Sequence, residues 1–134
     1  MNYWMVKTEP TSYSWEDLVK KGEDVWDGVR NYQARNFLKA MQKGDLVLFY
    51  HSGKDKAIVG VAEVSEEAFP DPKDTAWEAV TLRAKNALTN HVTLAQIKAE
   101  DRLSEMLMLR QSRLSVMSVT TTEFELILKM GSSN

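Results

Sequence analysis

The chain has 134 residues, of which 43% are hydrophobic and 27% are charged, and its formal net charge is -2. A length of this order suits one compact fold, so we expect a single domain over residues 1–134. The absence of cysteine excludes disulfides, thiolate catalysis and cysteine-ligated metal sites. A net charge this close to zero argues against coating a duplex by bulk electrostatics, but it allows contact with one or two nucleotides.

The N-terminal residues do not resemble a targeting segment. Lys7 and Glu9 interrupt the apolar residues of Met1–Thr11, so this stretch lacks the apolar core of a signal peptide. No uncharged run approaches the roughly 18 apolar residues that a membrane-spanning helix requires. We therefore expect a soluble monomer without membrane contact, cytoplasmic or, in a eukaryote, nuclear.

The first part of the chain predicts one strand and two helices. Asn2–Lys7 is a strand candidate. Ser14 can cap a helix over Trp15–Lys21, which Gly22 ends. Asn31–Met41 places apolar residues at positions i, i+3, i+4 and i+7, which is typical of a helix with one buried face.

The central part predicts a hairpin. Asp45–His51 and Ile58–Val64 are nearly continuous apolar runs of strand length, joined by the polar turn Ser52–Lys56. Trp77–Ala84 and Ser112–Val119 are further strand candidates.

The last two helices are predicted from their first residues. Thr93 with Gln96, and Thr120 with Glu123, form capping-box patterns, and the second helix ends at Gly131. Separate strands with short, scattered helices disfavour a βαβ sheet. They favour an α+β fold, a small, partly closed β-barrel of mixed or antiparallel strands surrounded by short helices.

Charge is distributed unevenly. Trp26–Lys54 carries five Lys and Arg residues against two Asp, whereas Glu63–Glu78 carries six acidic residues against one Lys. The two segments are either two solvated faces or a cationic side toward phosphate and an acidic side away from it.

Two stretches near the N-terminus bear candidate ligand-binding groups. The first strand candidate runs into Lys7, Thr8, Glu9 and Pro10, which offer a cation, a hydroxyl and a carboxylate to a base edge or a phosphate. The alternative is a solvated strand end whose Lys–Glu pair contributes little.

The second stretch, Val25–Arg35, combines a strand end, a glycine turn and a helix N-terminus. Trp26 can stack on a base and Asn31 can bind donor and acceptor atoms in one plane. Alternatively, Trp26 belongs to the core and Asn31 only caps the helix.

Two later stretches offer polar side chains at strand ends. Tyr50, His51 and Ser52 can form a pocket rim, or they are barrel packing that ends in a polar turn. Leu109–Val116 contains two arginines, which suit phosphate, although its polar side chains can also simply face water.

No metal or hydrolase motif is present in the sequence. The chain has two histidines, and it contains no Gly-x-Ser-x-Gly, H-E-x-x-H, EF-hand or P-loop pattern. We therefore expect neither a metal nor a cofactor.

Eight motifs in order along the chain resemble the EVE domain of the PUA-like superfamily, the thymocyte nuclear protein 1-like family. They are Y-W-M-V-K-T-E-P, Y-S-W-E-D-L, W-D-G-V-R-N-Y-Q-A-R-N, G-D-L-V-L-F-Y-H-S, I-V-G-V-A-E-V, F-P-D-P, V-T-L-A-Q-I-K and R-L-S-V. The resemblance covers nearly the whole chain. It implies a PUA-like pseudo-barrel, related to YTH domains, that binds a modified nucleobase in a pocket.

The resemblance also implies which residues build the pocket. Carried over to this chain, the ligand-binding set is Lys7, Thr8, Glu9, Pro10, Trp26, Gly28, Val29, Arg30, Asn31, Tyr50, His51, Ser52, Arg110, Arg113 and Ser115.

The sequence thus favours recognition without catalysis. The expected partner is DNA or RNA bearing a modified base, of the 5-methylcytosine or 5-hydroxymethylcytosine type in DNA, and the chain either acts alone or recruits an effector protein in trans. The competing hypothesis is an amidohydrolase of an acylated nucleoside, in which Lys7, Thr8 and Glu9 form a nucleophile–base set. The related ASCH family, which resembles this chain in fold and chemistry only, suggests that alternative.

Overall fold

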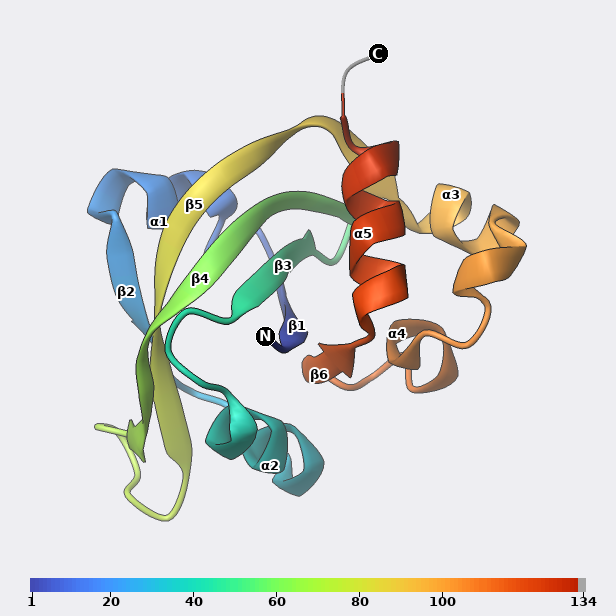
Figure 1. Ribbon diagram of the computed structural model, residues 1–134. Helices are drawn as coiled ribbons and strands as arrows, with labels where there is room; N and C mark the ends of the chain where they lie inside the picture. The colour runs from blue at the N-terminus through green and yellow to red at the C-terminus, as the bar shows by residue number, and fades with distance from the viewer. Residues whose placement is uncertain (133–134) are drawn as a thin grey trace.

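A mixed six-stranded sheet with five short α-helices around it forms the body of the protein (Figure 1). The computed structural model describes residues 1–132. The strands are β1 (Tyr3–Thr8), β2 (Glu23–Trp26), β3 (Leu46–His51), β4 (Ala57–Pro70), β5 (Glu78–Thr93) and β6 (Val116–Val119). The helices are α1 (Trp15–Lys21), α2 (Tyr32–Ala40), α3 (Leu94–Ala99), the 3₁₀ turn η1 (Asp101–Leu103), α4 (Leu107–Arg110) and α5 (Thr121–Met130).

The strand order in the sheet is β2-β5-β4-β3-β1-β6. Within residues 1–132 the neighbours β1 and β3 are the one parallel pair, with Tyr3 opposite Leu46, and the other pairs are antiparallel. Register shifts between Ile58 and Gly60 and further along β4 mark bulges, which bend a sheet. The two long strands curve around the others (Figure 1), but β2 and β6 remain as separate edges, so the barrel is not closed. The predicted α+β PUA-like class is confirmed.

The predicted strands are present with different lengths. β4 and β5 extend well beyond the predicted Ile58–Val64 and Trp77–Ala84, because the added residues of each strand pair chiefly with the predicted part of the other and include exposed polar side chains. The strand predicted over Ser112–Val119 begins only at Val116. β2 and α4 have four residues each, too few to show a periodicity in the sequence.

The starts of α1, α2, α3 and α5 were predictable because each of these helices has a capping side chain. Ser14, Thr93 and Thr120 each accept a hydrogen bond from the backbone three residues later and complete a capping box. Asn31 caps α2 through Oδ1, which accepts from the Ala34 N–H at 2.9 Å. Within residues 1–132, none of the helices is long and apolar enough to cross a membrane.

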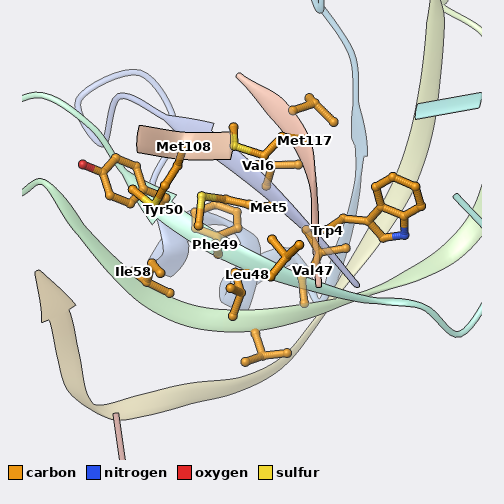
Figure 2. Packing of buried hydrophobic residues seen from close by; sticks show 14 of the residues in the cluster. Trp4, Met5, Val6, Val47, Leu48, Phe49, Tyr50, Ile58, Met108 and Met117 are labelled. Atoms are coloured by element: carbon orange, nitrogen blue, oxygen red, sulfur yellow. The ribbon is translucent and has the colours of Figure 1, made fainter. Parts of the chain in front are cut away.

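The hydrophobic core is centred on β1 and β3. Met5 and Val6 of β1, with Leu48 and Phe49 of β3, are fully buried, and Figure 2 shows Met117 of β6 packed beside them. Central strands covered on both faces have continuous apolar runs, which is why these two strands could be predicted from the sequence. The ends of β1 and β3 therefore lie at fixed positions beside each other.

Gly60 allows α1 to pack against the sheet. A Cβ atom at this position would lie 2.6 Å from Cε2 of Trp15, so Gly60→Ala is expected to lower the free energy of unfolding by about 1–3 kcal/mol. Urea denaturation measures the loss. In a Trp15→Leu background the same substitution should cost much less, and an equal cost in both backgrounds would contradict the proposed clash.

Candidate functional site

A cleft of about 640 Å³ opens at the C-terminal ends of β1 and β2. Its rim is the loop from Asp27 to Arg30, which leads into α2. β1 and β6 continue side by side to this point, because the Lys7 N–H donates to the Ser115 carbonyl at 2.9 Å. We call this space the Trp26 cleft.

Seven of the fifteen predicted residues line the Trp26 cleft. They come from three of the four predicted stretches, and they are Lys7, Thr8, Trp26, Gly28, Val29, Arg30 and Ser115. The sheet order explains this convergence, since β6 adjoins β1 whereas β2 lies at the opposite edge and approaches across the curved sheet.

Trp26 forms the aromatic wall of the cleft. Its ring packs edge-to-face against Tyr13, with ring centroids 5.8 Å apart, and against Phe49 at 5.5 Å. The side chain is only half-buried, so the remainder of its surface is available to a ligand. An indole fixed by two aromatic neighbours is a preorganised surface for a flat base.

A tyrosine–carboxylate pair faces Trp26 and was not predicted. The Tyr13 hydroxyl donates to Oδ2 of Asp24 at 2.7 Å. Burial, reinforced by this bond and the Asp24 charge, raises the pKa of Tyr13. Burial alone would raise the pKa of Asp24, but hydrogen bonds from Tyr13, Lys21 and the Val25 N–H lower it on balance. The cleft therefore presents a carboxylate that accepts hydrogen bonds.

Asp71 holds the rim loop from beneath. Its buried carboxylate accepts from the Gly28 N–H and from Nη1 of Arg30, both at 2.9 Å, and from the Lys73 N–H at 2.7 Å. Burial alone would raise the pKa of Asp71, but these hydrogen bonds outweigh it and hold the value at about 2. Gly28 has a φ of +79°, which favours glycine. The rim is thus fixed by one buried anion.

Four cations and two carboxylates line the Trp26 cleft. The cations are Lys7, Lys21, Arg30 and Lys73, and the carboxylates are Asp24 and Asp27. Three of the cations form ion pairs with carboxylates of the cleft or with Asp71. Lys7 instead donates to the Ser112 carbonyl at 3.0 Å, and burial lowers its pKa. Within residues 1–132, Lys7 is the cleft cation without a carboxylate partner.

Comparison with known proteins identifies the family of the chain. The profile described as "EVE domain" matches residues 2–130. The chain belongs to the EVE domain family. Thymocyte nuclear protein 1 of Mus musculus is 33% identical over 96% of this chain and 73% of its own length. The human protein of that name is 30% identical with the same coverage.

Solved structures superpose on this EVE domain over nearly their whole length. An NMR structure from Rhodopseudomonas palustris is 45% identical, with a TM-score of 0.93 and coverage of 98% of this chain and 93% of that one. Human thymocyte nuclear protein 1, solved in complex with DNA containing 5-methylcytosine, is 29% identical, with a TM-score of 0.93 over 100% and 99% of the two chains. A YTH domain from Zygosaccharomyces rouxii, at 17% identity and a TM-score of 0.62, shares the fold.

Two predicted residues of the EVE domain line a neighbouring groove instead of the Trp26 cleft. Tyr50 and Ser52 face a space of about 260 Å³ that also borders on Lys7. Between them, His51 is buried: Nε2 accepts from the Trp15 N–H at 3.0 Å, and Nδ1 lies 3.1 Å from Oδ2 of Asp55. The ring of His51 therefore anchors the start of α1.

The other predicted residues lie outside the Trp26 cleft. Asn31 caps α2, and the carboxylate of Glu9 lies against Gly53. Arg110 forms an ion pair with Glu105. The remaining two, Pro10 and Arg113, are not lining residues either, although both are at least partly exposed.

Proposed function

We propose that this EVE domain binds a modified nucleobase of DNA or RNA in the Trp26 cleft and performs no chemistry on it. The observation that carries the proposal is the half-buried indole of Trp26, which lines the same cleft as the Asp24 carboxylate and as Lys7, a cation without a carboxylate partner within residues 1–132. The human relative solved with 5-methylcytosine DNA supports it. The proposal places the base in the cleft and its phosphate at the cationic rim.

The energetics allow a single base to enter. Unstacking costs a few kcal/mol, and least for a base that is already single-stranded. Stacking on Trp26 returns roughly 1–3 kcal/mol. The Asp24 carboxylate can accept an exocyclic N–H, while Lys7 and Arg30 meet phosphate. An added methyl group in an apolar notch gives about 10- to 100-fold selectivity.

A binding titration tests the proposal. Short single- and double-stranded DNA and RNA, each with cytosine, 5-methylcytosine or 5-hydroxymethylcytosine, are titrated at low salt, because phosphate contacts weaken with salt. We expect about 10-fold or greater preference for one modified strand. Equal affinity across all strands would contradict recognition of modified cytosine.

The amidohydrolase alternative has less support in this geometry. The Thr8 hydroxyl donates to the Tyr13 carbonyl at 2.8 Å, and the Glu9 carboxylate lies beside Gly53. Neither group is therefore positioned to activate the other as a nucleophile–base pair. Turnover of N4-acetylcytidine that is lost in Thr8→Ala would contradict a non-catalytic function.

We propose that the domain either acts alone or recruits an effector protein in trans. We propose that the domain acts as a monomer, with residues 1–134 as its single unit. The name of the vertebrate relatives supports a nuclear location if the chain is eukaryotic.

A further inference from the structure

A second groove lies on the other side of Lys7 from the Trp26 cleft. It has a volume of about 260 Å³, and its polar lining comes from Lys7, Tyr50, Ser52, Lys56, Lys98 and Ser112. We call it the lysine groove. Lys7 lines both spaces, so a ligand in the Trp26 cleft and one in the lysine groove would both border on this residue.

The charge of the lysine groove has one sign. Lys7, Lys56 and Lys98 line it, and no carboxylate does so within residues 1–132. Two carboxylates lie close by: Asp55 borders a neighbouring hollow with Lys56 and Lys98 and contacts His51, and the Glu9 carboxylate lies against Gly53. Three lysines around a small space, in a chain of net charge -2, favour an anionic ligand.

The backbone at Lys56 supports a functional reason for a lysine at this position. Lys56 has a φ of +44°, the left-handed region in which glycine and asparagine are favoured. Its carbonyl accepts from the Leu94 N–H at 2.8 Å, which ties the β3–β4 turn to the start of α3. A lysine in this conformation costs stability relative to glycine, and such backbone strain is concentrated at functional sites.

We infer that the lysine groove binds the phosphodiester that follows or precedes the base held in the Trp26 cleft. The inference rests on the proposed function, because the shared Lys7 is what makes the two ligands parts of one strand. Lys56 and Lys98 then hold the neighbouring phosphate without reading sequence. The lysine groove adds affinity, whereas the Trp26 cleft sets base preference.

The test compares Lys56→Gly, Lys98→Gln and the control Lys39→Gln. Lys39 is an exposed lysine of α2 that lines neither space, so its loss changes net charge equally. We expect Lys56→Gly and Lys98→Gln each to weaken binding of a single-stranded oligonucleotide about 5-fold. Each should also reduce the slope of the logarithm of the binding constant against the logarithm of the salt concentration by about 0.7. Lys39→Gln should stay within about 2-fold, and Lys56→Arg should restore binding.

Lys56→Gly also separates function from folding. Glycine relieves the strained φ, so its melting temperature should equal or exceed that of the natural chain while its affinity falls. The free nucleoside 5-methyl-2′-deoxycytidine lacks a phosphate, and its binding should be unchanged by Lys56→Gly and Lys98→Gln.

Two outcomes overturn the inference. One is that Lys56→Gly and Lys98→Gln weaken oligonucleotide binding no more than Lys39→Gln does. The other is that they abolish binding to vesicles containing phosphatidylserine and leave oligonucleotide binding intact, which would assign the groove to a lipid surface. If the groove lysines matter but no strand with a modified base is preferred, the lysine groove stands as a phosphate site and only the proposed base recognition fails.

Discussion

Trp26→Ala is expected to weaken binding of the preferred modified oligonucleotide by about 10- to 100-fold. The substitution removes the stacking surface, which is worth roughly 1–3 kcal/mol per base. Because Trp26 is half-buried and packs on Tyr13 and Phe49, it also lowers the free energy of unfolding, by about 2 kcal/mol. Fluorescence anisotropy measures the affinity, and circular dichroism shows whether the sheet persists.

Two further variants distinguish stacking from a general loss of aromatic surface. Trp26→Phe keeps a ring in the cleft and should retain most of the affinity. Tyr32→Ala removes an exposed aromatic side chain of α2 that does not line the cleft, and it should leave binding unchanged. An affinity within about 2-fold in Trp26→Ala would show that the base binds elsewhere.

The parts of the fold that could be predicted are those whose evidence is local in sequence. The apolar runs of β1 and β3 and the capping residues Ser14 and Thr120 each specify their element within a few residues. The lengths of β4 and β5 could not be predicted, because the residues that extend each strand are held by pairing with the other strand and show no apolar pattern of their own. The parallel pairing of β1 with β3, separated by some 40 residues, leaves no local pattern.

In the candidate site, too, residues marked by a local sequence pattern were predicted and residues brought in by long-range contacts were not. Trp26 and Gly28 were predicted because both belong to the motif within Val25–Arg35. Lys7 was predicted because it ends the strand candidate Asn2–Lys7. Tyr13 was missed although it opens the motif Y-S-W-E-D-L, since only the curvature of the sheet brings it to Trp26. Asp71 was missed because its partners are 41 and 43 residues earlier in the chain.

Conversely, His51 and Asn31 carry chemically versatile side chains but form structural hydrogen bonds. Nε2 of His51 accepts from a backbone N–H of α1, and Oδ1 of Asn31 accepts from the first turn of α2. Residue type alone does not separate a ligand contact from a cap, because the same donors and acceptors serve both.

Asp71→Ala is expected to lower both stability and binding. The substitution leaves the Gly28 N–H and the Arg30 guanidinium without their buried acceptor, and loss of one partner of such a pair costs about 3 kcal/mol. The rim loop should loosen, which weakens oligonucleotide binding by about 10-fold. Asp74→Ala, in the same β4–β5 connection but exposed, is the matched control and should cost less than about 1 kcal/mol.

The pH dependence of stability gives a second test of Asp71. Its pKa is about 2 in the folded protein against an ordinary value of 3.8, so the folded state favours the ionised carboxylate. The resulting stabilisation, about 2–3 kcal/mol, is fully present above roughly pH 4 to 5 and is lost as the pH falls toward 2. Asp71→Ala lacks this carboxylate, so its unfolding free energy should not fall by this amount on acidification. The difference in unfolding free energy between the natural chain and Asp71→Ala therefore shrinks as the pH falls. A difference that stays constant from pH 6 to pH 2 would mean that the Asp71 charge does not hold the rim.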